Sequence, residues 1–371
     1  MKRRQFLSGA VAAGAAAASP GSRGQISGSS SPASIGSYGA DGHIPRVTAA
    51  TAGIMRGEML YRKLGATGVE VSAIGMGGAH LGGRSMSDAD ATKLMHEAID
   101  RGINFMDNCW DYNDGRSETR MGDALAQGGY RQKVFLMTKI DGRSKQLAAQ
   151  QLDESLRRLK TDHIDLVQHH EILRFDDPDR LFAEGGGNEA LVEAKKAGKI
   201  RFIGFTGHKD PRVHLYMLEV AKKHGFQFDT LQCPINVMDA HFRSFSQLVV
   251  PRANEEKVAV LGMKSIGSGI LLKSKVVTAP ECLRYSLNLP IAVQITGIDS
   301  KEVLDQAFAV VKNFKPMPNA EFAALVGKTK EVAMDGKYEL FKTSTTFDGT
   351  VKHPEWMGGD VDAVKRMASR A

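Results

Sequence analysis

Cysteine is scarce in this sequence of 371 residues, and the three cysteines, Cys109, Cys233 and Cys282, form no C-x-x-C pair. An odd and widely spaced set excludes a disulfide framework and a four-thiolate metal site. Also missing are an apolar run long enough to span a membrane and a cluster of basic residues that would bind nucleic acid. We therefore expect packed free thiols, no stable membrane span and no nucleic-acid partner.

The basic charge is concentrated at the N-terminus, where residues 1–57 supply +5 of the net charge of +7. Arg3 and Arg4 precede an alanine-rich apolar run over 11–18, which is the layout of a signal peptide and is similar to a twin-arginine (Tat) signal. Residues 19–57 are rich in Ser, Gly and Ala, a composition that cannot bury enough apolar surface to fold. We predict a Tat-type signal peptide and flexible linker over 1–57. The protein is then periplasmic or secreted, exported folded by the Tat translocase; the alternative is a disordered basic tail.

From residue 73 onward, eight short apolar runs alternate with amphipathic helical patterns. This alternation predicts a parallel sheet, and eight units over about 250 residues match a closed (β/α)8 TIM barrel. An open doubly wound sheet is the alternative, although no G-x-G-x-x-G follows the first run. We expect strands at 73–77, 103–107, 134–139, 163–169, 200–205, 229–234, 258–263 and 291–296. We expect helices from Ser87 and at 117–127, 146–159, 188–198, 211–224, 245–256, 279–288 and 300–313.

The barrel is predicted to occupy residues 58–316 and to begin with a β-hairpin over 61–72, because a turn signal separates two polar-apolar segments there. Residues 317–371 are predicted as a C-terminal helix followed by an extended tail. The loop over 171–187 is long for a compact domain and is a candidate substrate lid.

Polar side chains stand at the ends of three early strands. Asp107 ends one strand, with Tyr112 in the loop behind it, Lys139 ends the next, and His169 and His170 end the third. In a barrel the carboxyl ends of the strands meet at the active face, so these groups would share one pocket. A lysine beside a tyrosine favours the phenolate and makes the phenol a better proton donor. The pattern therefore predicts proton donation to a carbonyl oxygen. Successive residues of a strand point to opposite sides, so only one of the two histidines can face the barrel interior, and the alternation does not show which one.

The string from Asp107 to Tyr112, followed by Gly-Arg-Ser-Glu, with Thr138-Lys139 and the segment 165–170, resembles the aldo-keto reductases. The resemblance extends over residues 60 to about 315. It implies that Tyr112 is the general acid, that Lys139 and Asp107 tune it, and that His170 orients the carbonyl. It also implies that the C-terminal tail borders the pocket.

Hydride chemistry needs a cofactor, and barrels commonly hold phosphates on the loops after strands seven and eight. A basic, glycine-rich loop follows the seventh strand, and a helix start follows the eighth, where an anion is favoured. The first strand also ends in glycines. The candidate cofactor-binding residues in these segments are Gly77, Lys264, Ser265, Gly267, Gly269, Gly297 and Ser300.

The resemblance places further cofactor contacts. Thr206, Gly207 and Gln232 stand where the family binds the nicotinamide carboxamide, and Met263 where it packs a ring on the nicotinamide; Asp107 borders the same site. Gly207 lacks the family's amide side chain, so Thr206 and Gln232 are expected to carry that contact. Asp299 would repel a 2′-phosphate but accept from a ribose hydroxyl. The cofactor is thus NADPH or NADH, with NADH favoured although Lys301 leaves NADPH open.

We therefore predict an NAD(P)H-dependent aldo-keto reductase that acts on a small aldehyde or ketone, or on the alcohol in reverse. One alternative is a nicotinamide-binding sensor or subunit without turnover on the same fold. A second is a metal-dependent barrel hydrolase that uses His169 or His170. No second histidine stands at ligand spacing, so we expect no metal.

Overall fold

The computed structural model describes residues 50–358. The predicted signal peptide, most of the predicted linker and the last thirteen residues of the predicted tail lie outside this range. Among the described residues, no helix combines the length and the apolar character needed to cross a membrane.

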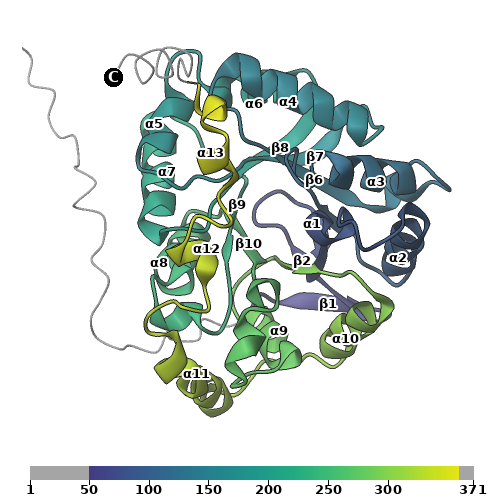
Figure 1. The fold of residues 1–371 in the computed structure, drawn as a ribbon, viewed down its shortest axis with the longest axis vertical. Helices are drawn as coiled ribbons and strands as arrows, with labels where there is room; N and C mark the ends of the chain where they lie inside the picture. Colours follow the sequence, from purple (N-terminus) through teal and green to yellow (C-terminus); the bar gives the residue numbers. More distant parts are fainter. Residues whose placement is uncertain (1–49, 359–371) are drawn as a thin grey trace, which may run out of the picture.

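Eight parallel strands close into a barrel, with β11 paired back onto β4. The closure confirms the (β/α)8 prediction and excludes the open sheet, and Figure 1 shows the helices arranged around the barrel. The strands are β4 (Ile74–Gly77), β5 (Phe105–Asp107), β6 (Phe135–Ile140), β7 (Ile164–His169), β8 (Ile200–Thr206), β9 (Thr230–Pro234), β10 (Ala259–Met263) and β11 (Val293–Gly297).

The outer helices begin where the sequence offers capping side chains. Ser87, Ser144, Asp210, Ser244, Thr278 and Ser300 each accept a hydrogen bond from a backbone N–H in the first turn of the helix that follows. The helices are α2 (Asp88–Asp100), α3 (Arg116–Leu125), α4 (Lys145–Arg158), α6 (Gly187–Lys196), α7 (Pro211–Lys223), α8 (Phe245–Glu255), α9 (Ala279–Leu287) and α10 (Lys301–Lys312). Two short helices, α1 (Gly78–Leu81) and α5 (Asp176–Phe182), lie in segments predicted as loops.

A small antiparallel sheet covers the amino-terminal end of the barrel. It contains β1 (Gly53–Arg56), β2 (Met59–Lys63) and β3 (Glu70–Ser72), so the predicted hairpin is present and has one additional strand. The prediction of a linker up to residue 57 is wrong at its end, because β1 is ordered by main-chain pairing with β2 although all four of its residues are exposed.

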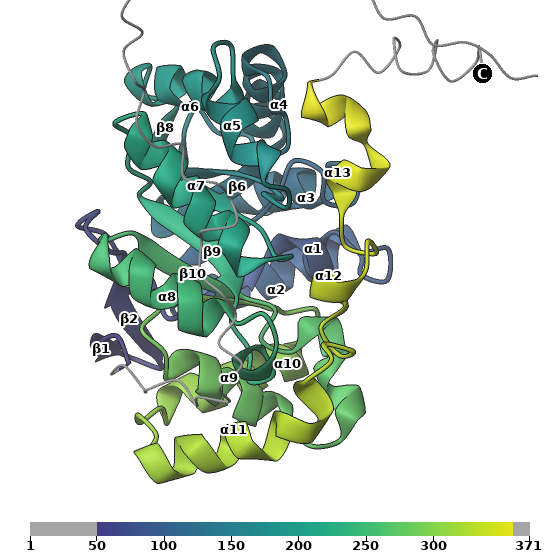
Figure 2. The same ribbon diagram turned by 90° about the vertical axis from the view of Figure 1, so that its left-hand side faces the viewer.

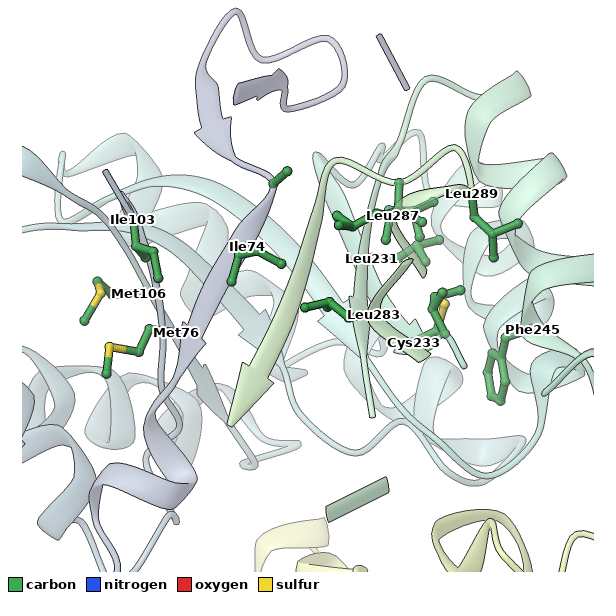
Figure 3. Packing of buried hydrophobic residues seen from close by; sticks show 14 of the residues in the cluster. Ile74, Met76, Ile103, Met106, Leu231, Cys233, Phe245, Leu283, Leu287 and Leu289 are labelled. Atoms are coloured by element: carbon green, nitrogen blue, oxygen red, sulfur yellow. The ribbon is translucent and has the colours of Figure 1, made fainter. Parts of the chain in front are cut away.

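Alternation along the strands separates two hydrophobic layers. Phe105, Met137 and Leu166 belong to the cluster inside the barrel, whereas Met106 and Ile74 face the helices. In Figure 3, Ile74, Met76, Ile103 and Met106 lie close together beside β4. Since successive residues of a strand point to opposite sides, Asp107 and Lys139 lie on the inward side with Phe105 and Met137.

The C-terminal segment crosses the carboxyl-terminal mouth of the barrel (Figure 1), on the side opposite to β1 and β2 (Figure 2). It contains α11 (Asn319–Ala333), α12 (Leu340–Thr343) and α13 (Gly349–Lys352). Lys342, fully buried, donates to Asp239 and is paired with Glu339, and this buried contact fixes α12 to the barrel. The predicted helix is therefore present, while the predicted extended part contains short helices that depend on contacts with the barrel.

Candidate functional site

A buried ion pair lies at the carboxyl ends of β5 and β6. Lys139 Nζ donates to Asp107 Oδ1 over 2.5 Å and to the backbone oxygen of Asn108 over 2.7 Å. Its third contact, at 3.3 Å, is with the hydroxyl of Tyr112. Only 1% of the Lys139 side chain and 4% of the Asp107 side chain are exposed. The ammonium is thus held by three oxygens, one of which is the phenol.

His170 lies beside Tyr112, with ring centroids 5.9 Å apart in an edge-on arrangement. Its Nδ1 is 2.8 Å from Asp141 Oδ1, 3.3 Å from Cys109 Sγ and 3.9 Å from Asp111 Oδ1. His169 instead contacts Asn188 of α6 and the ring of Phe228, so it lies in the outer layer. Of the two histidines, His170 is therefore the one beside the phenol.

Burial raises the pKa of Tyr112 well above its usual value, and the carboxylate of Asp107 raises it further. This direction is opposite to the sequence-based expectation of a phenol made more acidic by Lys139. The physical reason is that the sequence shows the lysine but neither the burial of the phenol nor the carboxylates that surround it. In this structure Tyr112 is a phenol that keeps its proton at neutral pH.

For His170, burial and the nearby carboxylates shift the pKa in opposite directions. Burial alone would lower its pKa, but the carboxylates of Asp141 and Asp111 outweigh burial and raise the pKa to about 9. The pKa of Asp111 rises to about 6, first because it is buried and second because Asp141 is close to it. The imidazole is therefore a cation at neutral pH as long as a proton occupies Nδ1.

Two adjoining cavities of about 380 and 530 Å³ open at this mouth of the barrel. Tyr112, Met263 and Lys264 line both of them, so they form the boundary. The smaller cavity continues along the loops after β10 and β11, and the larger one lies beneath the C-terminal segment. A two-part site of this kind can hold two molecules in contact across Tyr112.

The smaller cavity collects most of the predicted cofactor residues, namely Gly77, Asp107, Gln232, Met263, Lys264, Ser265, Gly267, Gly269, Gly297 and Asp299. Thr206 and Gly207 line the larger cavity instead. The hydroxyl of Ser300 caps α10 and lies in a neighbouring surface hollow with Asp299.

The residues of the smaller cavity fit a nicotinamide dinucleotide. Gln232 is buried, and its Oε1 has no hydrogen-bond partner, so it can accept from a carboxamide. Gly267 and Gly269 have positive φ angles of 54° and 83°, and the space beside Gly269 is open, which lets a phosphate approach the backbone.

Gly207 has a packing reason that the sequence did not reveal. A Cβ at this position would lie 2.3 Å from the carbonyl oxygen of Ile172 and 2.8 Å from the ring of His214. An amide side chain at this position has no room, which leaves Gln232 and, from the adjoining cavity, Thr206 as side chains that a carboxamide could reach.

Several lining residues were not predicted from the sequence. The larger cavity includes Asp111 and Glu171, together with Phe347, Gly349 and Lys352 of the C-terminal segment. Asp141, which contacts His170 and does not line the cavity, lies two positions after Lys139, and residues two apart along a strand face the same side, so the sequence offered a signal for it. The resemblance implied that the tail borders the pocket, but the sequence did not show which of its residues do so, since more than 170 positions separate Phe347, Gly349 and Lys352 from His170.

Comparison with known proteins identifies related chains. Residues 73–324 match the sequence model described as "Aldo/keto reductase family". The chain is 31% identical over 226 residues to aldo-keto reductase YhdN of Bacillus subtilis, covering 57% of this chain and 64% of YhdN, less than two thirds of that relative. It is 29% identical over 249 residues to Protein tas of Escherichia coli, covering 57% and 70%. The holo structure of aldo-keto reductase AKR11C1 from Bacillus halodurans superposes with a TM-score of 0.60 at 25% identity, covering 73% of this chain and 96% of that one.

Proposed function

Because the chain belongs to the aldo/keto reductase family, which uses nicotinamide cofactors, we propose that it is an NAD(P)H-dependent oxidoreductase that reduces a small aldehyde or ketone with Tyr112 as general acid. The observation that carries the proposal is the position of Tyr112. Its phenol lies on the boundary between the two cavities, within 3.3 Å of the buried Lys139 ammonium.

A bound reduced nicotinamide supplies the hydride, and the chain supplies the proton and the orientation. His170 faces the larger cavity and can donate to the carbonyl oxygen, which places this oxygen beside the Tyr112 hydroxyl. When Tyr112 gives up its proton, Lys139 stabilises the phenolate, and Asp107 keeps that ammonium charged and in place. The raised pKa of Tyr112 means that the donor form is the one present before reaction.

The preference for NADH gains support from the ion pairs around the adenosine end. Lys301, the cation that left NADPH open, is 2.6 Å from Glu97 and 3.4 Å from Asp305. Its charge is thus already compensated, while Asp299 lines the cofactor cavity. We expect NADH to bind more tightly than NADPH in a competition titration that follows protein fluorescence.

The function is tested by mixing the purified protein and each nucleotide with a panel of carbonyl compounds. Turnover is measured as the loss of nicotinamide absorbance. Before the panel, mass spectrometry of the denatured protein identifies any nucleotide that copurifies. Turnover of at least one carbonyl class supports the proposal. Nucleotide binding with no turnover of any carbonyl contradicts it and supports the alternative, a nicotinamide-binding sensor without turnover.

The N-terminal residues support a second part of the proposal, that the folded protein is exported by the Tat translocase. Arg3 and Arg4 stand before the apolar run in the order that such signals use. Replacing both by lysine is expected to keep the protein in the cytoplasmic fraction. Equal export of the variant and the native chain would contradict this assignment.

A further inference from the structure

A second chemical feature lies behind the imidazole of His170. Cys109, Asp111, Asp141 and His170 each present one ligand atom, and these four atoms all lie within 4.8 Å of one another. The residues follow three adjacent strands, β5, β6 and β7, so the barrel itself brings them together. From this arrangement we propose that the four side chains bind one divalent transition-metal ion of the Zn²⁺ type.

The donor set matches this class of ion. A thiolate, an imidazole nitrogen and two carboxylate oxygens are the ligands that Zn²⁺ takes, with bonds of about 2.0–2.3 Å and thus about 3.3–3.8 Å between neighbouring ligands of a tetrahedron. The distances from His170 Nδ1 are 2.8 Å to Asp141, 3.3 Å to Cys109 and 3.9 Å to Asp111. The three contacts of His170 Nδ1 thus differ from these ligand–ligand distances by about half an ångström or less.

Unpartnered acceptors in this cluster point to a cation. Asp111 Oδ1 faces His170 Nδ1 yet has no hydrogen-bond partner, although the atom is buried. Asp141 is fully buried, and its Oδ2 also lacks a partner. Orphaned buried carboxylate oxygens are costly. A proton on the imidazole offers one charge to two carboxylates, whereas a divalent ion offers two.

The surroundings allow the ion to enter and to remain. Asp111 and His170 line the larger cavity, which gives access from solvent, while Cys109 and Asp141 are fully buried behind them. Binding displaces the Nδ1 proton of His170 and the thiol proton of Cys109, and both protons leave to solvent. Nε2 then keeps its hydrogen, so the imidazole remains a donor towards the cavity.

The site is tested with the purified full-length chain, stripped with a chelator and then titrated with Zn²⁺ alone. One equivalent per chain is expected to remain after gel filtration and to be detected by elemental mass spectrometry. Co²⁺ is expected to give a thiolate-to-cobalt charge-transfer band. These readouts do not depend on turnover, so they are informative whether or not the chain reduces a carbonyl.

Variants locate the ion. Cys109→Ser is expected to abolish the charge-transfer band, and Asp141→Asn to weaken Zn²⁺ binding at least about tenfold. Cys282→Ser and Asp335→Asn are the matched controls, because both residues lie outside the cluster and outside the two cavities, and they are expected to bind Zn²⁺ like the native chain. Circular dichroism of each variant verifies that it is folded. No retained Zn²⁺ and no cobalt band in the native chain, or equal metal binding by Cys109→Ser and Asp141→Asn, would overturn the proposal.

Discussion

At the scale of single residues, Lys139 and Asp107 form a buried ion pair at the mouth of the barrel. Both side chains are almost completely buried, and Lys139 has no acidic partner other than Asp107 within the described residues. We predict that Lys139→Met lowers the free energy of unfolding by about 3–5 kcal/mol, because a buried carboxylate loses its counter-charge.

Urea denaturation measures this loss. The double variant Lys139→Met/Asp107→Leu is the informative comparison, since it removes both charges and is expected to regain a large part of the stability. If the double variant is as unstable as Lys139→Met, the loss comes from packing and not from the unpaired charge.

The sequence was informative about residues that follow strand periodicity. Asp107 and Lys139 could be placed on the inward side because inward positions alternate along β5 and β6. The direction of the pKa shift of Tyr112 could not be predicted, because it depends on the burial of the phenol and on the carboxylates that the fold brings near it. Gly207 was predicted as a cofactor contact, but its small size is explained by the carbonyl oxygen of Ile172, which no sequence pattern reveals.

At the scale of secondary-structure elements, the C-terminal segment forms the outer wall of the larger cavity. Glu171, which directly follows His170, accepts hydrogen bonds from the backbone of Gly349 and from the backbone and hydroxyl of Thr350. Asp348, which directly precedes Gly349, is paired with His208 at 3.0 Å and with Lys209 at 2.8 Å. These contacts join the start of α13 to the ends of β7 and β8.

We predict that Glu171→Gln loosens this segment, because an amide oxygen is a weaker acceptor than a carboxylate and leaves part of the N–H groups unsatisfied. Hydrogen exchange of residues 345–352 is expected to become faster, and the KM for the carbonyl to rise, while nucleotide affinity stays unchanged. Glu184→Gln, on the exposed surface, is the control. Unchanged exchange in Glu171→Gln would show that other contacts hold the segment.

Long elements were predictable and short ones were not. The eight barrel strands and the helices between them follow clear hydrophobic periods, so their predicted bounds differ from the observed ones by few residues. In contrast, α1, α12 and α13 have four residues each, too few to form a helix without tertiary contacts. The strand β1 was missed because its pairing leaves no buried face to mark it.

At the scale of the whole molecule, buried neutral histidines make stability depend on pH. Burial lowers the pKa of His214, whose ring is enclosed between β9 and α8, to about 4. Between pH 6.5 and 4 the unfolded chain binds a proton at this residue while the folded chain does not, so the free energy of unfolding falls as the pH falls. The loss from this residue is about 3 kcal/mol across the whole window.

Urea denaturation at pH 7 and at pH 4.5 tests this dependence. The difference in unfolding free energy between the two pH values is expected to become smaller in His214→Leu, which cannot take up the proton. His163→Gln, at an exposed position, is expected to behave like the native chain. An equal pH dependence in His214→Leu and the native chain would contradict the assignment.

The overall architecture was predictable because eight strand-helix units of regular length permit few arrangements, and closure followed from their number. The path of the C-terminal segment could not be predicted in this way, because it is fixed by single buried contacts such as that of Lys342 with Asp239. Export through the Tat translocase concerns residues outside the described range and stays a prediction.

The central claim is that the Tyr112 phenol, held beside Lys139, protonates the carbonyl oxygen. The most direct measurement is the rate of nicotinamide oxidation in Tyr112→Phe, compared with the native chain and with Tyr216→Phe, whose hydroxyl lies on the surface against Asp179. We predict that Tyr112→Phe loses about 10²- to 10⁴-fold in rate with nucleotide binding intact, and that Tyr216→Phe keeps the native rate. A rate for Tyr112→Phe equal to that of the native chain would contradict the claim.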